Sequence, residues 1–435
     1  MLKKSIFNRM IYKDNVTLAF NSLSCCLAEV DDDFLNLLNS CDQIDAHPED
    51  HEMLQEMIRG GFIVDESINE LDKIKILSNS GRYGMTRVWG LTIVPTLACN
   101  FVCDYCFEEK KNIYMNKEVE DAIIALIENN ISNYEALEIC WFGGEPLLAY
   151  DTIISLSERM MDLCKKKGKN YSATMISNGY LLSNHQYEKL RDQQVRQIQI
   201  TIDGTKEVHN ERRRLKGSSI GGFDRILQNV KELVKYLHVR IRINIDKTNI
   251  DQAKKVVELF DDIENRDHIS FNLGLLTDNE YVNQSLSCNF FSIEEYSYLS
   301  YEFNQYLRQK GFSFHQELYD PKVKLNHCLA DRIDSILIDP SGDIYKCFQN
   351  VGDTKYCIGN LLKNENILDI QARGSRYILS SPLENMSCSS CDILPLCMGG
   401  CPAYFSKDTC RCDVAKYILN EYLWDNYIKE MELIS

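Results

Sequence analysis

The stretch VPTLACNFVCDYCFEEK, residues 94–110, carries three cysteines within eight positions, directly after the strand-like run WGLTIVPT. Cys99, Cys103 and Cys106 form a C-x3-C-x2-C pattern. A structural zinc site needs a fourth ligand, and no further cysteine or histidine follows closely. An iron–sulfur cube held by three cysteines keeps one iron open for another ligand. The spacing therefore predicts an iron–sulfur centre with a vacant coordination position.

Composition and charge restrict the class of protein. At 435 residues the chain is long enough for two or three domains, and 44% hydrophobic residues supply an ordinary core. A net charge of −16 argues against broad nucleic-acid binding, which needs basic surfaces to displace counterions from phosphate. The first residues lack the apolar core of a signal peptide, and no run approaches the roughly 18–20 apolar residues of a membrane span. We therefore expect a cytoplasmic protein with no nucleic-acid or membrane partner.

Eighteen cysteines in a chain without an export signal are the unusual feature of the composition. A reducing compartment disfavours disulfides, so the clustered spacings indicate metal ligands. The cysteines outside the clusters are expected to be mostly small buried hydrophobic residues. They are Cys25, Cys26, Cys41, Cys140, Cys164, Cys288, Cys357 and Cys410.

Between residues 88 and 315, strand-like and helix-like segments alternate. Each strand candidate is rich in β-branched and apolar residues, and an amphipathic segment separates it from the next. The pattern predicts an α/β fold, a partial (β/α)6 TIM-like barrel whose chemistry lies in the loops after the strands. The cysteine loop is the first of these loops. The expected strands cover residues 90–96, 137–142, 171–177, 196–203, 239–245 and 269–276.

Residues 1–85 are predicted to form a separate winged-helix-like module in front of the barrel, with a simple packing extension as the alternative. The polar stretch 67–87 is expected to be the linker between module and barrel. The expected strands of the module are 16–22, 24–30 and 61–66, and its expected helices are 31–41 and 48–61.

Residues 325–435 are predicted to form a cysteine-rich iron–sulfur domain. The sequence Pro340-Ser341-Gly342 signals a hairpin turn near its start. The final segment, residues 414–434, is expected to form a helix that caps the domain.

With Phe107 directly after the last cysteine, the C-x3-C-x2-C loop resembles the cluster loop of the radical S-adenosylmethionine (radical SAM) superfamily. The run WFGGEP follows the second expected strand, where that superfamily contacts the amino group of S-adenosylmethionine (SAM). The resemblance assigns this contact to Gly143, Gly144, Glu145 and Pro146. Glycine lets the backbone approach a ligand closely, and a carboxylate suits an ammonium group. A glycine turn in which Glu145 caps the next helix is the alternative.

Further matches to the superfamily lie at the ends of the later strands. Ser177 and Asn178 end the third strand, where the superfamily contacts the SAM ribose, and Asp203 ends the fourth. Arg213 corresponds to an arginine that binds the SAM carboxylate, a role that suits the guanidinium fork. Asn244, at the end of the fifth strand, is expected to line the same site. The neighbours His209, a structural hydrogen bonder, and Arg212 and Arg214, solvated side chains, are expected to have no direct role.

The C-terminal cysteines resemble the SPASM domain, which accompanies one branch of the superfamily. Thirteen residues separate Cys328 from Gly342, four separate Gly342 from Cys347, and a C-x2-C-x5-C-x3-C run follows. The resemblance implies two auxiliary 4Fe–4S clusters. Cys328, Cys347 and Cys401 would hold one, and Cys388, Cys391, Cys397 and Cys412 would hold the other.

Several ligand assignments stay open at this level. Cys410 is the alternative to Cys412 as the last ligand of the second auxiliary cluster. The fourth position of the first auxiliary cluster falls to Cys288, to Cys357 or to a substrate thiolate at an open iron. A zinc ribbon is the alternative for the C-x2-C pairs.

The resemblance implies an enzyme that binds SAM and three 4Fe–4S clusters. It would cleave SAM reductively and use the 5′-deoxyadenosyl radical to take hydrogen from a substrate carbon. The N-terminal module resembles the leader-recognition module of maturases of ribosomally synthesised peptides (sactipeptide or ranthipeptide type), which add an extended peptide to a sheet edge. The expected partners are a ribosomal precursor peptide with its leader and an electron donor such as flavodoxin or ferredoxin. The expected product is a thioether between a cysteine sulfur and a carbon, and carbon–carbon crosslinks rank second.

Two other functions are weighed against this one. Anaerobic sulfatase-maturating enzymes, which make formylglycine, carry an aspartate as general base after the residue that matches Cys347, and Phe348 holds that position here. A non-catalytic iron–sulfur or zinc scaffold that binds peptides is the alternative from a different class, and the GGEP loop and Arg213 argue against it.

Overall fold

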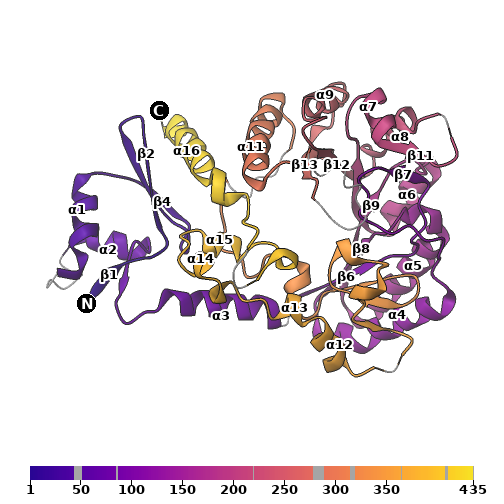
Figure 1. The fold of residues 1–435 in the computed structure, drawn as a ribbon, viewed down its shortest axis with the longest axis horizontal. Helices are drawn as coiled ribbons and strands as arrows, with labels where there is room; N and C mark the ends of the chain where they lie inside the picture. Colours follow the sequence, from indigo (N-terminus) through magenta and orange to yellow (C-terminus); the bar gives the residue numbers. More distant parts are fainter. Residues whose placement is uncertain are drawn as a thin grey trace. The chain divides into compact units, whose positions relative to one another are not determined.

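The computed structural model in Figure 1 divides into two compact units, which are described separately. The first unit combines residues 1–84, 316–332 and 379–435, and the second combines 85–315 and 333–378. No helix among the residues described is long and apolar enough to cross a membrane. The structure describes residues 1–43, 51–84, 87–218, 220–277, 289–313, 319–363, 365–406 and 410–434.

The second unit is built on one sheet of nine strands that is mostly parallel. Its six parallel strands in chain order are β6 (Val88–Ile93), β8 (Ala136–Trp141), β9 (Asn170–Ser177), β10 (Val195–Thr201), β12 (His238–Ile245) and β13 (Ile269–Leu275). Past β6 the sheet continues with β14 (Ile336–Ile338), which pairs with β6 in parallel. It ends with β15 (Asp343–Tyr345) and β16 (Gly359–Asn360), and β15 pairs antiparallel with both β14 and β16. The six strands expected from the sequence all form, and the α/β fold with a mostly parallel sheet is confirmed.

Helices separate these strands along the chain and pack their apolar faces on the sheet. In α4 (Lys117–Asn130), Val119, Ile123 and Ile127 are buried, and the Asn116 side chain caps the helix by accepting from the Val119 amide at 3.0 Å. The others are α5 (Tyr150–Lys167), α6 (Asn184–Asp192), α7 (Lys206–Arg212), α8 (Phe223–Leu233), α9 (Gln252–Glu258), α11 (Ile293–Lys310), α12 (Ile367–Arg373) and α13 (Ser375–Ile378).

The first unit joins both ends of the chain around shared apolar cores. Leu18 and Phe20 of its small antiparallel sheet pack in one cluster with Leu423 and Trp424 of the C-terminal helix. Its strands are β1 (Leu2–Lys4) paired with β5 (Ile63–Asp65), and the sheet β2 (Asn8–Lys13), β3 (Val16–Asn21) and β4 (Cys26–Val30). Its helices are α1 (Asp32–Ser40), α2 (Glu52–Arg59), α3 (Glu70–Tyr83), α14 (Met386–Ser389), α15 (Leu394–Cys397) and α16 (Ala415–Ile434).

The predicted linker at 67–87 is wrong, because most of it forms helix α3. Glu70, Ile74, Ser78 and Arg82 share the buried face of this helix at four-residue intervals, and three of these four residues are polar or charged. Arg82 forms an ion pair at 3.5 Å with Asp331, which is fully buried. The sequence of this stretch resembles a linker because Ser78 and Arg82, a small polar and a charged residue, occupy positions on the buried face of the helix.

Candidate active site

The cysteine loop follows β6 and is held by a short antiparallel ladder. Its strand β7 (Phe101–Cys103) pairs with β11 (Arg213–Leu215), which places Cys103 opposite Arg213. Cys99, Cys103, Cys106 and Arg213 all line one cavity of about 360 Å³. The fold therefore brings the three predicted cluster ligands and the predicted SAM-binding arginine to a common site.

The donor set of this loop fits an iron–sulfur cluster. Burial raises the pKa of Cys99 to about 12 and that of Cys106 to about 11, and Lys110 opposes both shifts. Thiols in such a place become thiolates when a cationic centre binds them. Within the described ranges, no three His, Cys, Asp or Glu side chains lie so close together that they could hold a single metal ion. A cluster differs from a single ion in this respect, because each cysteine binds a separate iron.

The two glycines of the GGEP loop let it pack directly on the backbone that leads into the cysteines. Gly143 has a φ of 124°, which favours glycine, and a Cβ atom there would collide with the Thr96 carbonyl oxygen. A Cβ atom on Gly144 would lie 2.7 Å from the Ala98 carbonyl carbon. The Glu145 amide donates to the Ala98 carbonyl oxygen at 2.9 Å. Contact between the two loops therefore accounts for both glycines.

Glu145 is fully buried and behaves as a structural carboxylate. It accepts from the Leu147 amide at 3.0 Å, from Ser177 Oγ at 2.9 Å and from the Asn178 amide at 2.7 Å. Burial raises the pKa of its carboxyl group. Neither Glu145 nor Pro146 is among the described residues that line the cavity. The geometry matches the helix-cap alternative, and the contact of Glu145 with the SAM amino group stays a prediction.

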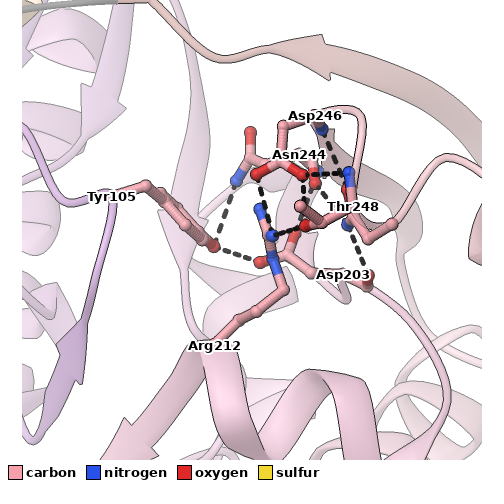
Figure 2. A network of polar contacts seen from close by, with 7 residues as sticks. Tyr105, Asp203, Arg212, Asn244, Asp246 and Thr248 are labelled. Atoms are coloured by element: carbon pink, nitrogen blue, oxygen red, sulfur yellow. Dashed lines mark hydrogen bonds and ion pairs between the residues drawn. The ribbon is translucent and has the colours of Figure 1, made fainter. Parts of the chain in front are cut away.

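Tyr105, between the second and third cysteines, is a site residue that the motif comparison did not single out. Its hydroxyl donates to the Asp203 carboxylate and accepts from Asn244 Nδ2 at 3.3 Å (Figure 2). It also accepts from Arg213 Nη1 at 2.7 Å. Burial raises the pKa of Tyr105 well above its usual value, so the hydroxyl stays protonated. One side chain thus ties the cysteine loop to the ends of β10 and β12 and to β11.

Arg212 corrects an expectation, because it is not a solvated neighbour. Its side chain is 14% exposed, and Nη1 donates to Asp246 at 2.9 Å (Figure 2). The guanidinium also lies over the Tyr105 ring, 5.4 Å from the centroid. Its partner lies 34 positions later at the end of β12, which local sequence does not reveal. Arg214, in contrast, is 59% exposed, as expected.

The other predicted SAM contacts divide between the cavity wall and its support. Asp203 is fully buried, is not among the described residues that line the cavity, and accepts from the Asn244 amide at 2.9 Å. His209 accepts from the Asp203 amide at 3.4 Å, and burial lowers its pKa well below the usual value, in agreement with a structural role. The predicted residues in the wall are Phe107, Gly143, Gly144, Ser177, Asn178, Arg213 and Asn244.

The predicted ligands of the second auxiliary cluster gather in the first unit. Burial raises the pKa of Cys388, whose thiol is hydrogen-bonded to Cys410 and lies near Cys397 and Cys412. Cys412 is also hydrogen-bonded to Cys410 and interacts with Cys391. Both candidates for the last ligand therefore lie beside the same group of thiols.

A tight backbone approach explains this gathering. Met398, Gly399 and Gly400 all have positive φ angles, so the chain turns sharply after Cys397. A Cβ atom on Gly400 would collide with the carbonyl oxygen of Arg411, the residue between the two candidate ligands.

The predicted ligands of the first auxiliary cluster are divided between the units. Cys328 and Cys401 belong to the first unit and Cys347 to the second, so this ligand set stays a prediction. Cys357 donates through its thiol to the Gly359 carbonyl oxygen at 3.1 Å. Cys288 lies outside the described residues.

Comparisons with known proteins agree with this geometry. The radical SAM cyclopropyl synthase TigE of Paramaledivibacter caminithermalis is 22% identical over 97% of this chain and 96% of its own. The structure titled anSMEcpe with bound AdoMet and Cp18Cys peptide aligns with a TM-score of 0.61 at 18% identity, over 80% of this chain and 99% of that one. Streptococcus suis SuiB bound to precursor peptide SuiA aligns with a TM-score of 0.56 at 15% identity, over 95% and 99%.

The family match covers the segment that runs from the end of β6 through the cysteine loop and the next four parallel strands. Residues 93–263 match the profile of the Radical SAM superfamily. The same segment carries the three cysteines, the GGEP loop and Arg213, which meet in the structure. Residues 93–263 therefore form a radical SAM domain, and the chain is an enzyme.

Proposed function

We propose that this enzyme is a maturase of a ribosomally synthesised precursor peptide. The observation that carries the proposal is the single cavity of about 360 Å³ that holds the three thiols, Arg213 and a polar wall. When bound there, a 4Fe–4S cluster and SAM would supply the radical that removes a hydrogen atom from an unactivated carbon.

The residues of the chain would bind and orient these groups. Cys99, Cys103 and Cys106 would ligate the cluster, and Arg213 would take the SAM carboxylate. Nε of Arg213 is buried without a hydrogen-bond partner among the described residues, as expected for a donor that awaits a ligand. The remaining proposed SAM contacts are Phe107, Gly143, Gly144, Glu145, Pro146, Ser177, Asn178, Asp203 and Asn244.

The same proposal includes two further domains and an electron donor. A SPASM domain within residues 325–435 would hold the two auxiliary clusters, and a winged-helix-like module within residues 1–85 would bind the peptide leader. A flavodoxin or ferredoxin would deliver electrons, and the enzyme would act in the cytoplasm. A structure of SuiB holds a precursor peptide, which supports a peptide substrate.

The bond formed is proposed to be a thioether between a cysteine sulfur and a carbon. A carbon–carbon bond is the second candidate, and the relative TigE, which is named a cyclopropyl synthase and spans nearly the whole chain, favours it. Both products require loss of hydrogen from carbon, so the site geometry serves either.

Formylglycine synthesis is less well supported by the residues in the cavity. Phe348, where those enzymes place a catalytic aspartate, lines the cavity and packs edge-on against Phe142 with the ring centroids 4.9 Å apart. An apolar ring at this position supplies no base for proton removal.

The test uses the full chain, reconstituted anaerobically with iron and sulfide. The enzyme should cleave SAM to methionine and 5′-deoxyadenosine, and a variant with Ala at Cys99, Cys103 and Cys106 should not. Cys164→Ala, which changes a buried thiol of α5, is the matched control and should retain cleavage. Cleavage by the triple variant would refute the assignment.

Mass spectrometry of a co-expressed precursor peptide, encoded beside the gene, identifies the product. Loss of two hydrogens with cysteines that resist alkylation indicates a thioether, and the same loss with cysteines that still react indicates a carbon–carbon bond. An unchanged peptide would exclude that peptide as the substrate.

A further inference from the structure

One face of the strands β10, β12 and β13 is polar, although strands of parallel sheets are usually apolar on both faces. The apolar face packs on the helices through buried residues such as Ile200, Ile241 and Phe271. The residues on the other face are Gln199 and Thr201 of β10, Arg240 and Arg242 of β12, and Ser270 and Asn272 of β13. Thr201 is buried and the other five are partly buried, so this face of the sheet is only partly covered by the rest of the chain.

Arg242 is the charged member of this face that lines the cavity. It lines the cavity together with Gln199 and Thr201, and its Nε donates to Asn244 Oδ1 at 2.8 Å. Gly274 lies on the adjacent strand β13. A Cβ atom on Gly274 would lie 2.6 Å from Nε and 2.7 Å from Nη2 of Arg242. The missing side chain of Gly274 therefore makes the space in which the guanidinium lies.

The guanidinium of Arg242 has no carboxylate partner among the described residues. Beside it on β13, Ser270 Oγ and Asn272 Oδ1 are buried and have no hydrogen-bond partner within the part of the chain that the structure describes. Asn272 pairs in register with Arg242, and Ser270 with Arg240. Buried polar atoms are rarely left unpaired, so this group of neighbours indicates a place that a polar ligand completes.

We propose that Arg242 binds a carboxylate of the peptide substrate, so that the enzyme selects peptides with an aspartate or glutamate beside the residue to be modified. This inference rests on the proposed peptide-modifying function and names its substrate class. Arginine suits the task because its two Nη groups match the two oxygens of a carboxylate.

The carboxylate of SAM is the other candidate ligand of Arg242. The position of Arg213 favours a peptide carboxylate instead. Arg213 lies opposite Cys103 in the β7–β11 ladder and is held by Tyr105, next to the cysteines. Arg242 is bonded instead to Asn244 and lies on the sheet face. The cavity thus contains one arginine for the carboxylate of SAM and one for a carboxylate of the peptide.

The experiment is a selection followed by a double-mutant cycle. A random peptide library displayed on phage is selected on the immobilised, reconstituted enzyme in the presence of SAM. We expect enrichment of Asp and Glu by the natural enzyme, although its net negative charge favours basic peptides non-specifically. The best acidic peptide and its Glu→Gln or Asp→Asn counterpart are then synthesised, and their affinities for each enzyme variant are measured.

Arg242→Gln, Arg242→Glu and the matched control Arg240→Gln are compared. The natural enzyme and Arg240→Gln should bind the acidic peptide about ten-fold more tightly than the amide peptide, and Arg242→Gln should bind both alike. Arg242→Glu should enrich Lys and Arg from the library, a gain that a misfolded variant does not show. Arg240 is a fair control because it lies on the same face of the same strand, two residues earlier.

Three results would overturn the inference. They are no acidic preference in the natural enzyme, an equal preference in Arg242→Gln, or a loss of SAM affinity in Arg242→Gln without loss of the acidic preference. None of them depends on SAM cleavage, so failure of the inference is separate from failure of the proposed function. Conversely, an enzyme that does not cleave SAM can still show the carboxylate preference.

Discussion

At the residue scale, the hydroxyl of Tyr105 joins parts of the chain that are far apart in sequence. Asp203, Arg213 and Asn244 all bond to it. Each partner is buried, so each needs the hydroxyl to satisfy its polar atoms. The Tyr105 hydroxyl therefore adds to the β7–β11 ladder in fixing the second and third cysteines relative to Arg213.

Tyr105→Phe is expected to destabilise the enzyme by about 1–3 kcal/mol, because buried groups lose their partner. It should also weaken SAM binding, since Arg213 loses its anchor. Chemical denaturation and SAM titration of the reconstituted enzyme measure the two effects. Tyr114→Phe is the control, since that side chain is 45% exposed, and equal results for both variants would contradict the role of Tyr105.

Individual site residues were predictable from the sequence only where a motif marks them. The spacing of Cys99, Cys103 and Cys106 identifies them at once, and they line the cavity together. Tyr105 and Arg212 are different, because their roles come from partners about 34 to 139 positions away. Such pairings arise from the order of strands in the sheet, and no local pattern encodes them.

At the scale of elements, the GGEP loop and the cysteine loop are packed backbone to backbone. Gly144→Ala is expected to cost about 1–3 kcal/mol, because the new Cβ atom would lie 2.7 Å from the Ala98 carbonyl carbon and backbone cannot easily yield. The displaced cysteine loop should also hold less iron. Denaturation and iron analysis are the measurements.

Gly90→Ala is the matched control for this element, because a Cβ atom at Gly90 in β6 would meet nothing within 4 Å. This variant should keep its iron and its stability. If Gly144→Ala behaves like Gly90→Ala, the loops are not in the contact described.

The β14–β15 hairpin should give the enzyme a distinct pH dependence. Asp339 accepts from the Ser341 amide at 2.8 Å and the Asp343 amide at 3.0 Å, and burial raises its pKa to about 6. The unfolded value is roughly 3.9, so the fold binds this proton more tightly than the unfolded chain does. The stabilisation that the protonated Asp339 gives the fold is therefore complete below about pH 4, and it is lost as the pH rises through about 6.

Asp339→Asn isolates this contribution, because the amide stays neutral throughout. Relative to the variant, the natural enzyme should lose on the order of 1–3 kcal/mol of unfolding free energy between pH 4 and 7. Denaturation curves at several pH values measure it. If the unfolding free energies of the two proteins change by the same amount with pH, Asp339 has the same pKa in the folded and unfolded states.

Elements were predictable where apolar residues recur with a clear period. The six parallel strands satisfy this condition, and all of them form. Helix α3 does not, because Ser78 and Arg82 occupy its buried face. A buried arginine looks like a solvated one until its partner Asp331, far along the chain, is placed beside it.

At the scale of the whole molecule, the two ends of the chain depend on each other. Phe20 is fully buried and belongs to the same apolar cluster as Trp424. Phe20→Ala should cost about 3–5 kcal/mol through the cavity it leaves. It should also speed hydrogen exchange in α16, which is nearly 400 positions away in sequence.

Tyr12→Ala is the control for this prediction, because Tyr12 lies on the neighbouring strand and is 68% exposed. It should leave exchange in α16 unchanged. Unchanged exchange in the Phe20→Ala variant would mean that the N-terminal segment folds as an independent module.

The unit built from both chain ends also sets an order of events during synthesis. Residues 1–84 leave the ribosome first, but the segment 379–435 that completes their unit is made last. At about 5–20 residues per second, the strand that carries Leu18 and Phe20 waits roughly 20–80 s for its partner helix. The radical SAM domain is complete before that moment, so its cysteine loop can receive iron while the nascent chain still has an exposed apolar sheet at its front. We therefore expect the yield of intact enzyme to depend on protection of that sheet as well as on loading of the first cluster.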